Sequence, residues 1–180
     1  MRSLKISLAL GFVLLIAGCV VSSLYPFFTE KDLVFDPSFL GTWAGQDEDD
    51  TLVFKDVDGK TYDLTYITEG QGLKFEVHLV KLGELKFFDV YPKVSKDHDA
   101  FHLIPAHTIW KVQKDEDIIR IAWLDQNWLK EKIAKKEILI PHQLVEDRII
   151  LTATTEELQK FVLKYADEAF PDFNEFKLQK

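Results

Sequence analysis

The 180-residue sequence contains a single cysteine, Cys19, so no disulfide can form within one chain and packing alone must hold the fold together. Only two serines, Ser38 and Ser95, lie beyond residue 23, and neither sits in a motif typical of a nucleophilic serine. A glycine-rich phosphate loop and a His-Glu-X-X-His motif are also absent. We therefore expect a protein that is not an enzyme and that carries no cofactor.

The sequence has no apolar run of the roughly 20 residues that a membrane-spanning helix needs. The longest one covers residues 6–15, follows Arg2 and Lys5, and ends in small residues before Cys19. A charged start, an apolar middle and a small-residue end are typical of an export signal. A transmembrane anchor and an ordinary secretory signal are the alternatives.

The tetrapeptide Ile16-Ala17-Gly18-Cys19 resembles the lipobox of bacterial lipoproteins at all four positions. The resemblance implies that residues 1–18 are a signal peptide and that Cys19 becomes acylated, which places the protein on a membrane of the cell envelope. Because Val20 is not an aspartate, the sorting rule that accompanies the lipobox indicates the outer membrane. We expect residues 19–32 to be the acylated cysteine and a tether, with Phe27 and Phe28 docking on the domain that follows; insertion of the two rings into the headgroup layer is the alternative.

The net charge of the chain is −8, and loss of residues 1–18 removes Arg2 and Lys5 but no acid, which changes it to −10. An acidic protein repels nucleic acid and anionic lipid headgroups. We therefore expect no nucleic-acid partner and membrane attachment through lipid on Cys19. The high hydrophobic content (47%) and 14 phenylalanines predict a single packed domain over residues 33–180.

Alternation of apolar and polar residues predicts a mainly β fold. Leu73, Phe75, Val77 and Leu79, for example, share one face of a strand. The pattern gives eight antiparallel strands, the last over residues 148–153, which can close into a barrel. Asp125 predicts a short helix over residues 126–134, placed before the last strand.

The C-terminal part of the sequence predicts an amphipathic helix. Thr154 and Glu157 form a capping box, and apolar residues then repeat at helical spacing as far as Phe170. We expect a polar tail after this helix, with Phe173 and Phe176 as docking points.

The sequence Gly41-Thr42-Trp43 resembles the Gly-X-Trp opening of lipocalin and calycin barrels. The resemblance implies that Trp43 packs across the closed end of an eight-stranded barrel under an arginine, for which Arg148 is the nearest candidate. The family's Thr-Asp-Tyr motif is absent, and another antiparallel sheet is the alternative. The runs 39–43 and 151–161 are also similar to those of predicted bacterial lipoproteins, a likeness that implies no activity.

Two groups of residues are candidates for metal binding. His98, His102 and His107 lie close in sequence, but their spacing fits no established zinc pattern. The acidic run 47–50 lacks the spacing of a calcium-binding loop. We expect neither group to hold a metal.

The aromatic residues of the predicted strands suggest two functions. On the period-two pattern they line the sheet interior, where a wide barrel binds an apolar ligand and a narrow one is simply filled. The first function is therefore a binding module for a small hydrophobic ligand. The residues expected to line that site, two of them polar or charged and the rest aromatic, are Trp43, Phe75, His78, Phe87, Asp89, Trp110 and Trp123, with His107 as a further polar candidate.

The second function is a protein-interaction or envelope-assembly lipoprotein with a solid core. Such a protein would use an outer surface, for which the acidic run Asp47-Glu48-Asp49-Asp50 and a basic partner are the candidates.

Overall fold

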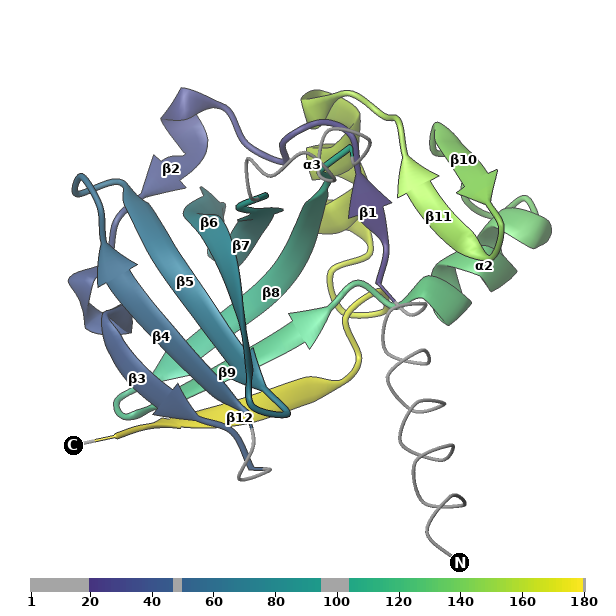
Figure 1. The fold of residues 1–180 in the computed structure, drawn as a ribbon. Coiled ribbons are helices and arrows are strands. Elements are labelled where there is room, and N and C mark those ends of the chain that lie inside the picture. The colour runs from purple at the N-terminus through teal and green to yellow at the C-terminus, as the bar shows by residue number, and fades with distance from the viewer. Residues whose placement is uncertain (1–19, 47–49, 95–103, 180) are drawn as a thin grey trace, which may run out of the picture.

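The computed structural model describes residues 20–46, 50–94 and 104–179. The predicted signal peptide over residues 1–18, Cys19, residues 47–49 of the acidic run, His98 and His102 lie outside the described residues. An eight-stranded antiparallel β-barrel dominates the fold (Figure 1). Its strands are β3 (Gly41–Ala44), β4 (Thr51–Asp56), β5 (Thr61–Thr68), β6 (Gln71–Leu82), β7 (Leu85–Pro92), β8 (His107–Asp115), β9 (Ile118–Trp123) and β12 (Phe173–Leu178).

The strands from β3 to β9 follow one another around the barrel, and β12 closes it by pairing with both β3 and β9. Short turns join the strands from β4 to β7 and join β8 to β9, whereas residues 93–106 connect β7 to β8. Gly59, for example, has a φ of 75° in the β4–β5 turn, where glycine adopts a positive φ without strain. The predicted eight-stranded barrel is thus confirmed. The segment 148–153, predicted as the last strand, forms β11 (Arg148–Leu151) outside the barrel.

The predicted polar tail is instead the eighth barrel strand, β12. Its residues alternate, so that Phe176 is buried inside the barrel and pairs with Ile119 while Phe173 packs on the outside. Six residues with two phenylalanines three positions apart give a weak strand signal. Only the two open edges that β3 and β9 would otherwise leave explain why this segment becomes a strand.

Three short strands extend the sheet beyond the barrel from β8. Strand β1 (Ser22–Ser23) lies antiparallel to the first residues of β8 and parallel to β11, and β10 (His142–Val145) pairs with β11. Strand β9 pairs only with the later part of β8. The later part of β8 therefore belongs to the barrel, and its first residues belong to the extension. The short strand β2 (Leu33–Val34) pairs with β6, between the 3₁₀ turns η1 (Glu30–Asp32) and η2 (Pro37–Phe39).

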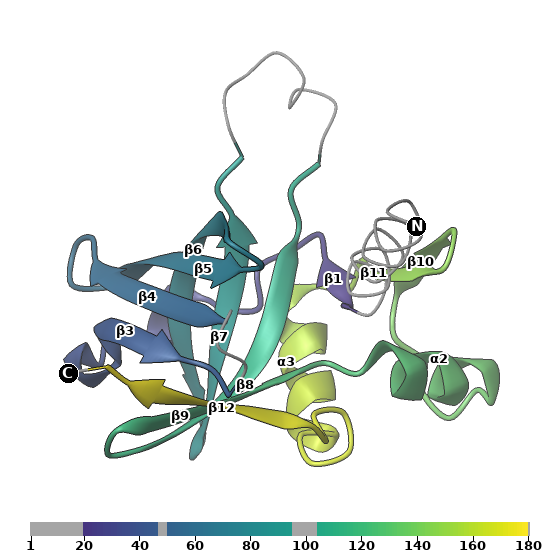
Figure 2. The same cartoon turned by 60° about the horizontal axis from the view of Figure 1, so that its bottom comes forward.

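Among the described residues, two helices complete the fold, and both begin at caps that the sequence predicts. Asp125 accepts hydrogen bonds from the first turn of α2 (Gln126–Ala134), and Thr154 and Glu157 form the capping box of α3 (Thr155–Lys164). Both helices lie with β1, β10 and β11 on one side of the barrel (Figure 2).

Two hydrophobic cores result from this arrangement. The inner core fills the barrel, and the outer core lies between the barrel wall and the elements of the extension. Fully buried members of the inner core include Phe39, Trp43, Phe54, Tyr62, Leu64, Leu79 and Phe88, and those of the outer core include Phe27, Phe87, Leu129, Leu151, Leu158 and Phe170.

The Gly-Thr-Trp motif has a structural role at the start of β3. Gly41 has a φ of 129°, and a Cβ atom there would lie 3.0 Å from Leu178, which explains the glycine. Trp43 is buried and donates from Nε1 to the carbonyl of Phe39, at 2.8 Å. The cation over its ring is Lys114, 5.7 Å from the ring centroid. The expectation that Arg148 covers Trp43 is therefore wrong, because β11 lies outside the barrel.

The segment predicted as a tether is built into the fold from Val20 onward. Val20 forms a β-bridge with Asp125, and Val21 and Phe27 are buried in the outer core. Phe28 packs against the same core, so the expected docking of both phenylalanines is confirmed.

Candidate functional site

The seven residues expected to line a ligand site separate onto the two faces of the barrel wall. Trp43, Phe75, Trp110 and Trp123 belong to the inner core or pack against it, on its inner face. On β7, however, Phe88 faces inward, so its neighbours Phe87 and Asp89 face outward. His78 faces outward for the same reason, between Val77 and Leu79. The period-two pattern placed Phe87 on the wrong face, and one site cannot contain all seven residues.

One end of the barrel interior is filled by stacked aromatic rings. The rings of Phe39 and Phe54 lie 5.1 and 5.4 Å from that of Phe88, and Tyr62 packs edge-on against all three, at centroid distances of 6.0–6.5 Å. Such distances are those of directly packed aromatic pairs. This end of the barrel therefore has no room for a ligand.

The opposite end of the interior brings three of the predicted residues together. The Trp110 ring packs edge-on against Phe75 and Trp123, at centroid distances of 6.5 and 5.8 Å, and its Nε1 donates to Thr108 Oγ1 at 3.0 Å. Phe75 and Trp123 are partly exposed. A hollow of about 90 Å³ lies beside Trp123. Apart from Trp123 and Phe176, this hollow is lined by polar residues and Gly45, and neither Phe75 nor Trp110 lines it. It is too small for a whole fatty acyl chain.

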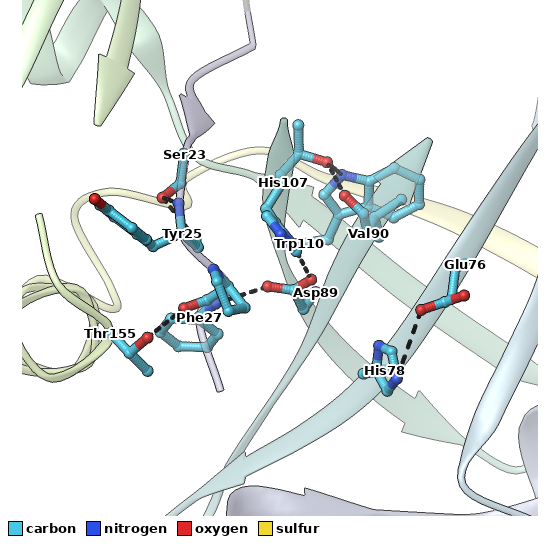
Figure 3. A network of polar contacts seen from close by, with 12 residues as sticks. Ser23, Tyr25, Phe27, Glu76, His78, Asp89, Val90, His107, Trp110 and Thr155 are labelled. Atoms are coloured by element: carbon cyan, nitrogen blue, oxygen red, sulfur yellow. Dashed lines mark hydrogen bonds and ion pairs between the residues drawn. The ribbon is translucent and has the colours of Figure 1, made fainter. Parts of the chain in front are cut away.

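Asp89 carries the most buried charge of the described residues, on the outer face of the barrel. Its carboxylate accepts a hydrogen bond from the Phe27 N–H at 2.8 Å and lies 2.7 Å from His107 Nδ1 (Figure 3). His107 stacks on Tyr91 at 4.5 Å, and its side chain is largely buried. A buried carboxylate needs such partners because its desolvation is costly. The pair holds the N-terminal segment on the barrel.

An Asp–His pair is also two thirds of a hydrolytic triad, so a nearby hydroxyl matters. Ser23 pairs with His107 in the β1–β8 register, but its hydroxyl is buried and donates to the carbonyl of Tyr25, at 2.8 Å. A nucleophile must instead donate to the histidine. The arrangement is that of a structural contact.

The other histidines contribute no metal centre among the described residues. His78 stacks on Phe28 at 4.5 Å and lies 3.4 Å from Thr61 Oγ1 and 4.0 Å from Glu76 (Figure 3). It is the cross-strand neighbour of Asp89 in the β6–β7 register. Within the described ranges, no three His, Cys, Asp or Glu side chains gather closely enough to hold a metal ion.

A surface groove of about 420 Å³ lies between α3 and the segment 137–141. Ile138, Ile140, Phe161 and Tyr165 make it apolar, and the highly exposed Leu139 lies on its rim. Charged side chains of both signs surround it: Glu137, Glu157, Lys160 and Lys164. The amphipathic pattern of α3 contains Phe161 and Tyr165, but segment 135–145 has no clear periodicity, so the sequence did not predict this groove.

No family model, curated protein or solved structure matches the chain. In the described part of the chain, none of the helices has the length and apolar character that crossing a membrane requires.

Proposed function

We propose that the protein is a lipid-anchored, non-catalytic component of the bacterial envelope that works through its outer surface, by binding another envelope protein. The observation that carries this proposal is the packed aromatic interior of the barrel around Phe88. A barrel whose interior is filled by side chains has no space for a ligand, so we expect it to bind its partner through its outer surface.

The lipobox resemblance at residues 16–19 supports the anchor, and Val20 supports an outer-membrane location. Labelled palmitate should enter the wild type and not Cys19→Ala. Equal labelling of the two chains, or none in either, would remove the anchor from the proposal.

The groove between α3 and segment 137–141 is the surface where we place the partner. An apolar floor between charges of both signs fits a protein segment that combines an apolar anchor with flanking charged residues. Leu139, whose exposed fraction is 89%, would then become covered in the complex.

A photo-crosslinking residue at Leu139 tests this placement in the intact envelope. The matched control is Val57, which is 58% exposed at the end of β4, away from the groove. We expect a discrete crosslinked protein from position 139 that is lost when Lys160 and Lys164 are both changed to Glu. The same products from position 57 would count against a partner in the groove.

A second candidate function is the binding of a small hydrophobic ligand, as the lipocalin resemblance implies. The observation that favours it is the cluster of Phe75, Trp110 and Trp123, of which Trp123 also lines a hollow of about 90 Å³. Native mass spectrometry of the acyl-free domain should then show a bound molecule that is lost in Trp123→Ala. Trp128→Ala, outside the barrel against Phe161, should retain it. A bare mass in the wild type would exclude this function.

A further inference from the structure

From Val20 onward, the chain is packed directly against the domain. Val20 forms a β-bridge with Asp125, Val21 is buried, and the N–H of Leu24 donates to a β11 carbonyl at 3.0 Å. Consecutive Cα atoms are about 3.8 Å apart. A group attached to residue 19 therefore begins directly at the surface of the domain, and no flexible linker separates them.

The surface next to Val20 is formed by the start of α2 and the turn between β10 and β11. Gln126 joins these two elements, since its Nε2 donates to Asp147 O at 3.1 Å and its Oε1 accepts the Ile149 N–H at 3.3 Å. Because β1 runs parallel to β11, the end of β1 that carries Val20 lies beside the first residues of β11 (Figure 1). The β10–β11 turn is thus held at the point where the chain enters the fold.

Two apolar side chains are exposed at this turn. Leu144 and Val145, at the end of β10, have exposed fractions of 62% and 52%. Among the described residues, β10 pairs only with β11, so it forms the free edge of the sheet extension. Exposed apolar side chains favour contact with an apolar phase. Leu144 and Val145 project from opposite faces of β10, so both reach such a phase where the turn enters it end-on.

The charge of this region also differs from that of the whole chain. Residues 126–148 carry five basic and four acidic side chains, in a chain whose net charge is −8. The segment as a whole is therefore not acidic, although the turn itself contains Glu146 and Asp147. Arg148 follows them, and Lys130 pairs with Asp147 at 2.6 Å. The basic residues are Lys130, Lys132, Lys135, Lys136 and Arg148.

From these observations we infer that the β10–β11 turn and the start of α2 lie against the lipid surface, with Leu144 and Val145 entering the headgroup layer. The inference rests on the proposed acylation of Cys19. Lipid chains that begin one residue before Val20 bring this face, and no other, to the bilayer. The protein is therefore seated in one orientation rather than held on a flexible tether.

Site-specific fluorescence on the acylated full chain tests this orientation. The chain has no cysteine besides Cys19, so Val145→Cys can be labelled selectively once Cys19 is acylated. Val57→Cys is the matched control, with a similar exposed fraction of 58% in the β4–β5 region. Both would be reconstituted in phosphatidylethanolamine vesicles with a minority of phosphatidylglycerol and brominated acyl chains. We expect several-fold stronger quenching of the probe at position 145 than at position 57.

Flotation of the same vesicles separates the possible failures. Protein that does not float with the vesicles and carries no acyl chain would overturn both the anchor and the orientation. Protein that floats but shows equal quenching at both positions would overturn the orientation alone. A probe at position 145 that becomes shielded only as protein concentration rises, without quenching, would mean that a second copy covers this edge, and would also overturn the orientation.

Discussion

Asp89 holds Phe27 against the barrel, although 62 positions separate the two residues in the sequence. One oxygen of the buried carboxylate accepts the Phe27 N–H at 2.8 Å, and the other lies 2.7 Å from His107 Nδ1. Thr155 and Gln159 of α3 donate to the carbonyls of Pro26 and Phe27, at 2.8 and 3.0 Å. Hydrogen bonds to both the barrel and α3 therefore hold the N-terminal segment in place.

The first prediction concerns the contribution of Asp89 to stability. Asp89→Asn removes the charge that binds the Phe27 amide and His107, and a buried hydrogen bond to a charged group contributes about 1.5–3 kcal/mol. We expect the free energy of unfolding in urea to fall by this amount and the Phe27 amide to exchange faster with solvent. Asp147→Asn, which alters an exposed carboxylate paired with Lys130, should change neither quantity appreciably. Equal effects of the two substitutions would contradict the role of Asp89.

The strands of the barrel from β3 to β9 were predictable because each carries its own local signal. Alternating apolar residues mark one face, as on β6, and turn residues such as Asp58 and Gly59 mark the ends. The caps of α2 and α3 are equally local, and both were predicted. These features depend only on residues a few positions apart.

The missed features depend on contacts between distant residues. Whether Phe87 or Phe88 faces inward is not decided by β7 itself, where Phe87, Phe88, Asp89 and Val90 are all buried. A strand with an apolar core on both sides shows no alternation of apolar and polar residues, so its sequence does not indicate which side chains face inward. The choice of β12 over β11 as the eighth strand likewise follows from closure of the barrel.

The second prediction tests how tightly the barrel interior is packed. Leu79 and Leu73 lie on the same face of β6, but Leu79 is fully buried and Leu73 is 45% exposed near the barrel mouth. Leu79→Ala should lower the free energy of unfolding by about 2–5 kcal/mol, because it leaves a cavity. Leu73→Ala should have a much smaller effect in the same urea titration. A small effect at position 79 would indicate a loose interior with room for a ligand.

The third prediction concerns the stability of the protein at alkaline pH. Burial raises the pKa of Tyr62 to about 12 from 10.0, and the nearby carboxylates of Asp36 and Asp56 add to the effect. Because the folded-state pKa is the higher one, the stabilisation is complete below pH 10 and is lost as the pH rises towards 12. Unfolding free energies measured across this range should fall more steeply for the wild type than for Tyr62→Phe.

At neutral pH, by contrast, Tyr62→Phe lowers the stability of the protein. The Tyr62 hydroxyl accepts the Asp36 N–H at 2.8 Å and donates to the Asp36 carbonyl at 3.0 Å. Tyr62→Phe removes both hydrogen bonds, so we expect a loss of about 1–3 kcal/mol near neutrality. Parallel stability curves for the two proteins above pH 10 would contradict the raised pKa.

The fourth prediction concerns closure of the barrel by β12. Phe176 is buried among the inner-core residues, whereas Phe173, three residues earlier on the same strand, packs partly exposed on the outer core. Phe176→Ala should lower the free energy of unfolding by about 3–5 kcal/mol, the usual effect of removing a buried aromatic ring. Phe173→Ala should lower the free energy of unfolding by clearly less, because the Phe173 ring is already in contact with solvent in the wild type. If β12 were only a docked tail, the two substitutions would have similar small effects, and β3 and β9 would have to be stable as free edges.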